Sequence, residues 1–343
     1  MMSRLRHIDL MRGLAILFMV EAHAASTFRP VGVDDGSILA LVVASVAGLA
    51  APLFVTISGW GLHTSVKRRE GDDFAAWMRW LGPRVVILVA CQLVVNLVMS
   101  HIFDWSAPGV LTLLAIVALL SPLLARLSTP ARSALFVLLL ASPSLFPDLT
   151  GLAMTWDDRV SVAGVGVWFS RLLFDGTYPL LPWLSFALLG GLLADLDETT
   201  RRRVLCLGIL LSIGTMAWSA TSGVNWALTS GDALLTFFPA SSPFLLVAAT
   251  TVLALHELTL RATFPNHGLP NWTSNLGRLS LSVYVLHFVP LAIYARMVET
   301  PPSLSVGMVL TLVYVLLWIP VGNGWFERAG GYSLEGLLKR LNS

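Results

Sequence analysis

Ten long apolar segments follow one another along the 343 residues of this chain. An α-helix needs about 20 apolar residues to cross the roughly 30 Å hydrocarbon core of a bilayer. Membrane-spanning strands are not indicated, because the segments are continuously apolar rather than alternating. The pattern predicts an all-α integral membrane protein with about ten transmembrane helices, in which residues 1–343 form one membrane-embedded domain. The predicted spans are 8–29, 37–62, 85–105, 109–126, 132–147, 179–196, 203–222, 242–260, 279–298 and 303–323.

The composition also favours a lipid environment. Hydrophobic residues make up 56% of the chain, charged residues only 12%, and the mean hydropathy is +0.76. Soluble domains are about 45–50% apolar and about 25% charged. So little charge cannot cover a soluble globule of this length. The composition therefore argues against a soluble enzyme, a disordered protein and a nucleic-acid-binding module, and no nucleic-acid partner is expected.

The basic residues between the spans predict the orientation of the chain. An even number of spans places both termini on one side of the membrane, and Lys and Arg gather in cytoplasmic segments. With a cytoplasmic N-terminus, all but four of the 22 Lys and Arg residues lie in inner segments. The exceptions are Arg29, Arg159, Arg171 and Arg296. We therefore predict a multi-pass membrane protein with both termini in the cytoplasm, and the expected location is a bacterial inner (plasma) membrane.

The first predicted span carries the ionisable residues Asp9, Arg12, Glu21 and His23 between its ends. Such groups are costly within a membrane helix and usually face a polar interior. Arg12 and His23 are eleven residues apart, which places them within about 20° of each other and about 16 Å apart along a helix. Asp9 is one turn from Arg12 and can pair with it. Glu21 points about 160° away from His23, so these two are not expected to form a dyad.

This spacing predicts a tunnel with a fixed cation at its cytoplasmic mouth and an imidazole deeper inside. A guanidinium binds phosphate in a planar fork, and an imidazole can act as a general base near neutral pH. A second interpretation fits the spacing equally well. In it, Arg12 reaches lipid phosphates and His23 hydrogen-bonds a backbone carbonyl. No sequence pattern indicates a metal site, a P-loop or a dinucleotide fold.

Five short motifs then occur in order along the chain. The first combines Asp9-x-x-Arg12-Gly13 with the spacing of ten residues between Arg12 and His23. The other four motifs are Phe54-x-x-x-Ser58-Gly59, Pro182-Trp183, Gly277-Arg278 with Tyr284 and His287, and the tail Ser333-Leu334-Glu335 to Arg340. With these five motifs the chain resembles the transmembrane acyltransferases, above all the acyltransferase-3 family and also the heparan-α-glucosaminide N-acetyltransferase-like family.

The resemblance implies an enzyme that moves an acyl group, often acetyl, from a cytoplasmic acyl-CoA co-substrate. The acceptor would be a hydroxyl or amine of a glycan or lipid-linked sugar of the cell envelope. His23 would be the catalytic residue, either activating the acceptor or carrying the acyl group, without a metal. The implied donor-binding residues are Arg12, Arg79, Arg84 and Arg278, and the supporting residues are Asp9, Glu21, Ser58, Trp183, Tyr284 and His287.

The chain departs from the family pattern at two places. The basic segment after the second span lacks Arg-x-x-Arg, so it leaves open whether the donor contacts Arg79, Arg84 or the cluster at 67–69. Ser333 stands where related sequences often have Pro. The main alternative is a transporter or flippase without chemistry, for which paired broken helices in corresponding halves would be expected and are not found. Membrane lipids are expected partners in either case, and both readings are compatible with a homo-oligomer.

Overall fold

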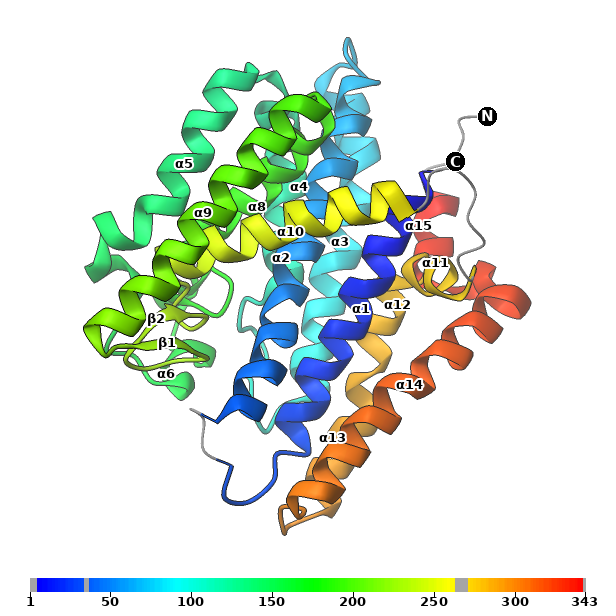
Figure 1. Cartoon of the computed structure of the whole chain (residues 1–343). Coiled ribbons are helices and arrows are strands. Elements are labelled where there is room, and N and C mark those ends of the chain that lie inside the picture. The colour runs from blue at the N-terminus through cyan, green and yellow to red at the C-terminus, as the bar shows by residue number, and fades with distance from the viewer. Residues whose placement is uncertain (1–4, 34–36, 263–270, 342–343) are drawn as a thin grey trace. The chain divides into compact units, whose positions relative to one another are not determined.

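The protein is described by a computed structural model that covers residues 5–33, 37–262 and 271–341. Helices make up 78% of it. The chain forms two compact units: Met1–Phe54 with Ala254–Leu341, and Val55–Leu253. Their boundaries fall inside two long helices, α2 (Ile38–Lys67) and α10 (Ser242–Ala262) (Figure 1).

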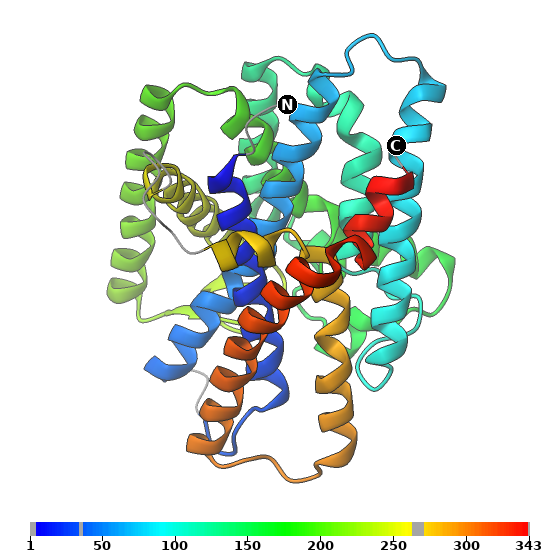
Figure 2. The same cartoon turned by 90° about the vertical axis from the view of Figure 1, so that its right-hand side faces the viewer.

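The first unit is built around α1 (Arg6–Thr27), which packs against four helices from the C-terminal part of the chain (Figure 2). Apolar side chains hold one end of this bundle. Ala24, Phe28 and Leu291 form a buried cluster there, with Tyr294 and Tyr314 packed against it. The other elements of the unit are α11 (Asn271–Gly277), α12 (Ser280–Leu286), α13 (Phe288–Met297), α14 (Leu304–Ala329), η3 (Gly330–Tyr332) and α15 (Leu334–Leu341).

The second unit is organised around α8 (Leu180–Asp195), whose residues from Pro182 to Leu193 are all buried. It packs against α5 (Thr129–Leu145) and α4 (Val110–Arg126). The remaining helical elements are α3 (Phe74–Val98), η1 (Pro147–Thr150), α6 (Trp156–Val160), α7 (Val165–Ser170), η2 (Arg171–Asp175) and α9 (Glu198–Ser222).

Helices α2 and α8 run parallel in register. Gly59 lies against Ala187, His63 against Gly191 and Lys67 against Asp195, and each pair is 128 residues apart. A Cβ on Gly59 would overlap the backbone carbonyl of Ala187, so only glycine permits this approach. Close backbone packing at small residues is typical of helices in membranes, where apolar surface alone gives no preference for another helix over lipid.

A two-stranded parallel sheet departs from the predicted all-α fold. Strands β1 (Asn225–Leu228) and β2 (Ala233–Thr236) pair with Asn225 opposite Ala233. Neither strand shows the alternation of apolar and polar residues by which a strand is recognised in a sequence. The rest of the expectation of a helical membrane protein is confirmed.

Among the described residues, six helical segments are long and apolar enough to cross a membrane. A seventh is obtained if the bent pair Val165–Asp175 and Leu180–Asp195 counts as one span, and α4 and α5 are shorter apolar helices. Each of the ten predicted spans overlaps at least one helix. Helix α1 is not among the six, and its six ionisable residues lower its hydropathy. The chain therefore has the helices of a multi-pass membrane protein, while the number ten stays a prediction.

The third predicted span was placed too late in the sequence. Residues 85–105 were expected, whereas α3 extends over Phe74–Val98. The helix starts early because the Asp73 side chain accepts a hydrogen bond from the Ala76 amide at 2.7 Å and so caps its first turn. Arg79 and Arg84, which were expected in a basic loop, therefore lie on a helix.

Candidate active site

Two histidines from distant parts of the sequence meet in the first unit. His23 lies on α1, and His287 lies at the junction of α12 and α13. Nδ1 of His23 is 2.8 Å from Nε2 of His287, and the two rings are nearly parallel at 19°. Phe288 packs against both rings, with centroid distances of 4.5 and 4.2 Å. His287 is fully buried, while His23 is partly exposed.

The hydrogen bonds of this pair define which ring nitrogens carry protons. Nδ1 of His287 is 3.1 Å from the Val283 carbonyl, which can only accept, so this nitrogen donates. The other nitrogen of a neutral imidazole is an acceptor. His287 Nε2 therefore accepts a hydrogen bond from Nδ1 of His23. By the same rule Nε2 of His23 carries a lone pair, and no described residue hydrogen-bonds to it.

Helix α14 and a neighbouring tyrosine hold His287 in place. The Tyr314 hydroxyl donates a hydrogen bond to the His287 backbone carbonyl at 2.5 Å. The ring of Tyr284 lies 6.0 Å from the His287 ring at a steep angle. Both Tyr284 and His287 are buried, as expected for residues one turn apart on the same face. His287 therefore has a fixed position from which it can orient His23.

The expected pairing of Asp9 with Arg12 is confirmed, with a distance of 3.3 Å between Oδ1 and Nη1. The carboxylate side chain is 4% exposed and the guanidinium 32% exposed. Gly277 packs directly on this turn of α1, because a Cβ there would overlap the Asp9 carbonyl and lie 3.0 Å from the Arg12 Cβ. Arg278 follows Gly277, and its guanidinium covers the Phe326 ring at 3.9 Å. Arg12 and Arg278, two of the four predicted donor-binding arginines, thus belong to two stretches of backbone that pack directly on each other.

Glu21 belongs to the same unit but not to the same contact. Its side chain is partly buried, and its Oε2 makes no hydrogen bond within the part of the chain that the structure describes. No contact joins it to His23, as the helical spacing predicted.

The other four predicted site residues lie in the second unit. Trp183 is fully buried, with the rings of Tyr178 and Phe237 at 5.1 and 5.3 Å. Ser58 is partly buried on α2, beside the glycine that contacts Ala187. On α3, Arg79 is exposed and Arg84 is partly buried.

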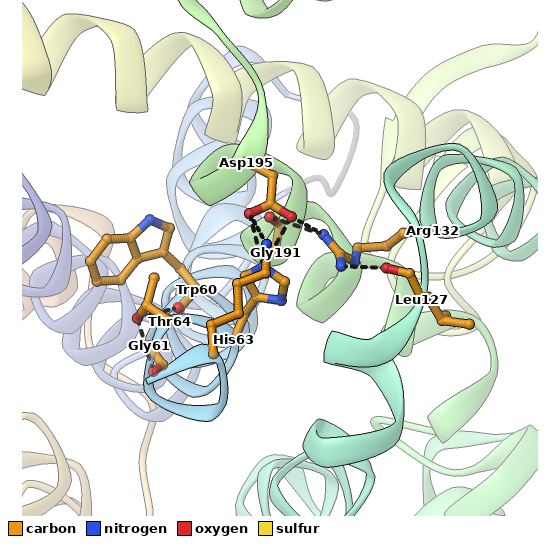
Figure 3. A network of polar contacts seen from close by, with 9 residues as sticks. Trp60, Gly61, His63, Thr64, Leu127, Arg132, Gly191 and Asp195 are labelled. Carbon is orange, nitrogen blue, oxygen red and sulfur yellow. Dashed lines mark hydrogen bonds and ion pairs between the residues drawn. The ribbon is translucent and has the colours of Figure 1, made fainter. Parts of the chain in front are cut away.

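A polar network in the second unit was missed at the sequence level (Figure 3). Asp195, the last residue of α8, accepts from Arg132 at 2.6 Å, from Lys67 at 2.8 Å and from His63 at 3.1 Å. Arg132 is 2% exposed and also donates to the Leu127 carbonyl at 2.8 Å. The network joins α2, α5 and α8. Asp195 and His63 are visible as ionisable residues at the ends of apolar segments, but the parallel alignment that brings them together is not.

A small pocket lies beside this network. Glycine at position 191 leaves room there, since a Cβ would be 3.3 Å from both His63 Nδ1 and Arg132 Cδ. Most of the lining is apolar. It consists of Gly59, Leu62, His63, Val117, Ser121, Leu124, Ala125, Arg132, Ala187, Leu188 and Gly191.

Comparison with protein families matches residues 5–323 to the acyltransferase domain of the acyltransferase-3 family. The chain belongs to the acyltransferase-3 family. A comparison with curated proteins found no match. The predicted family is therefore confirmed, and with it a membrane acyltransferase in general terms.

The acyltransferase-3 match contains all the predicted site residues, from Asp9 to His287. It ends within α14, before the C-terminal helix α15. Within the described ranges, no group of three or more His, Cys, Asp and Glu side chains is arranged to hold a metal ion.

Proposed function

We propose that this acyltransferase-3 protein transfers an acyl group, acetyl in the simplest case, from acyl-CoA to a glycan or lipid-linked sugar. The observation that carries the proposal is the lone pair on Nε2 of His23, which hydrogen-bonds to no described residue and which His287 holds in one tautomer. An imidazole with a free lone pair can take a proton from a hydroxyl or amine acceptor. The resemblance supplies the donor and acceptor classes.

In the direct route, His23 acts as a general base. Its Nε2 takes the proton of the acceptor hydroxyl while the acceptor oxygen attacks the thioester carbonyl. The carbon–sulfur bond then breaks, and the proton on Nε2 passes to the leaving thiolate. His287 keeps accepting from Nδ1 throughout, which stabilises the transient imidazolium of His23. General-base action of this kind contributes about 10²–10⁴-fold to rates.

In the alternative route, His23 carries the acyl group. Its Nε2 attacks the thioester, a carbon–nitrogen bond forms and the thiolate leaves. The Nδ1 proton passes to His287, so the acylated ring is neutral. The acceptor then attacks the acyl carbon, the carbon–nitrogen bond breaks, His287 returns the proton to Nδ1 of His23, and the proton of the acceptor passes to the thiolate. Both routes use the same hydrogen bond between the two histidines.

We assign binding of the donor phosphates to Arg12 on α1 and to Arg278, which lies beside this helix. Arg12 is partly exposed and offers a planar fork for phosphate, while Asp9 fixes its position. Arg278 lies next to Gly277, which packs on the same turn. Arg79 and Arg84 stay candidates for more distant donor contacts.

The topology of ten spans with both termini in the cytoplasm of a bacterium belongs to the same proposal. Its support is the excess of Lys and Arg in the expected inner segments. Reporter fusions at the C-terminus and in the loop after α5 test it. We expect a cytoplasmic signal from the first and a periplasmic signal from the second, and the reverse result would contradict the orientation.

The decisive experiment uses the purified full-length protein in lipid nanodiscs, with radiolabelled acetyl-CoA and an extract of membrane glycans. We expect label to appear on the glycan fraction with the wild type and with His101→Ala, an exposed histidine outside the site. We expect none with His23→Ala. Wild-type transfer by His23→Ala would refute the role of His23. In sealed proteoliposomes, passage of intact donor without transfer would identify a transporter instead.

A further inference from the structure

The first turn of α12 is capped by a residue far away in the sequence. A helix leaves its first amides without partners, and Ser, Thr, Asp or Asn at the N-cap usually accepts from them. The N-cap residue of α12 is Leu279, which cannot do so. Instead, Oε1 of Glu335 accepts from the amides of Leu281 and Ser282 at 2.5 and 3.2 Å. Glu335 belongs to α15, the C-terminal helix.

A serine completes the connection between α15 and α12. The Ser282 hydroxyl donates to Oε2 of Glu335 at 2.7 Å and accepts from the Leu334 amide at 2.8 Å. Ser282 is 1% exposed, so these bonds are shielded from competition by water. The four hydrogen bonds fix the first turn of α12 against the tail.

Helix α12 lies between two parts of the candidate active site. Arg278 comes two residues before its first residue, and His287 directly follows its last. Ser282 and His287 are five residues apart, or about 7.5 Å along the axis. Because the helix has seven residues, a displacement of its first turn moves the whole helix and the His287 ring with it.

We propose that Glu335 is a positioning residue for the His23–His287 pair and acts through the first turn of α12. The residue lies beyond the segment 5–323 that matches the family. Its effect on turnover rests on the proposed role of His23, whereas its effect on the geometry of the histidine pair does not. The carboxylate touches backbone amides and a serine hydroxyl, not the reacting groups.

The kinetic test compares Glu335→Ala with Lys339→Ala, which removes an exposed charge from the same helix. We expect Glu335→Ala to lower kcat for acetyl transfer about tenfold, the size of effect that loss of a helix cap can produce. The KM for acetyl-CoA should stay unchanged, as should both constants in Lys339→Ala. A rise in KM with unchanged kcat in Glu335→Ala would overturn the proposal.

A second measurement does not depend on activity. Diethyl pyrocarbonate acylates imidazole nitrogens that carry a lone pair, and mass spectrometry reads each site, with exposed His101 as the internal reference. Both nitrogens of His287 are engaged in the wild type, so its modification should be slow. We expect Glu335→Ala to accelerate it about tenfold, with a smaller acceleration in Ser282→Ala and no further gain in the double variant. Wild-type modification rates in both single variants would refute the role of Glu335, even if His23 proved dispensable for transfer.

Discussion

Two histidines, His23 and His63, show how differently the two units use the same side chain. In the first unit, His23 hydrogen-bonds to a neutral imidazole, and its second nitrogen stays open. In the second unit, His63 faces a carboxylate that Lys67 and Arg132 also bind. A His–Asp contact is the arrangement usually associated with general-base catalysis.

The comparison shows that the role of a histidine depends on what else its contacting residue binds, and not only on the type of that residue. Asp195 accepts from three donors, so its charge is shared between them and serves to join three helices. The contact between His23 and His287 contains no carboxylate, and its hydrogen bonds run in one direction, from the open nitrogen toward the Val283 carbonyl. We therefore place proton transfer in the first unit and structural anchoring in the second.

The largest effect is expected from His23→Gln. Transfer of label from acetyl-CoA should fall about 10²–10⁴-fold because the base is lost. The thermal unfolding midpoint in detergent should stay at the wild-type value, since the ring is partly exposed and makes one polar contact. The matched variant His63→Gln should keep its turnover per folded molecule. Wild-type turnover in His23→Gln together with a loss of turnover in His63→Gln would instead identify His63 as the general base.

Asp195→Ala should lower the stability of the protein, which His23→Gln should leave unchanged. Removing one partner of a buried ion pair costs about 3–5 kcal/mol, because the remaining charge stays buried. Arg132 would be that charge, since its side chain is 2% exposed. Thermal unfolding measures the loss, with Asp72→Ala, which removes a more exposed ion pair with Arg69, as the control. Unchanged stability in Asp195→Ala would mean that the network anchors nothing.

His287→Ala tests the hydrogen bond that orients His23. Hydrogen bonds to a charged group contribute about 1.5–3 kcal/mol, so kcat should fall on the order of 10–100-fold. The loss should be smaller than in His23→Gln, because the base is still present. An equal loss in the two variants would instead favour a direct reaction of His287 with the substrate.

The smallest effect is expected on binding of the acyl-CoA donor. Arg12→Lys keeps the charge but loses the planar fork, so we expect the KM for acetyl-CoA to rise about tenfold with little change in kcat. Gly277→Ala should act in the same direction, because its new methyl group would displace the turn that holds Asp9 and Arg12. Arg203→Lys, at an exposed position on α9, serves as the control. A wild-type KM in both variants would place the donor phosphates elsewhere.

Much of the fold could be predicted because it follows from local sequence. Ten apolar segments predict helices without knowledge of their neighbours, and the pair Asp9–Arg12 is one turn apart on one helix. The third span was misplaced because a single capping residue, Asp73, extended α3 toward its N-terminus. Short sequence patterns thus predict the structure of the helix in which they lie, but not its contacts with other helices.

The contacts between helices could not be predicted in this way. His23 and His287 are both candidate site residues, yet nothing in the sequence indicates that Nδ1 of one lies 2.8 Å from Nε2 of the other. The network around Asp195 depends on the parallel register of α2 and α8, which packing at Gly59 determines. Glu335 belongs to the tail motif, but its contact with α12 depends on how the tail folds back.

The separation of 264 residues between His23 and His287 has a consequence for biosynthesis. At about 5–20 residues per second, a ribosome needs roughly 15–50 s to add that length of chain. During this time α1 has been made, and His23 on it lacks the imidazole of His287 to which it later hydrogen-bonds. Under the proposed mechanism the newly made protein is inactive until its last helices have been made, and premature termination before α12 yields a protein without an assembled histidine pair.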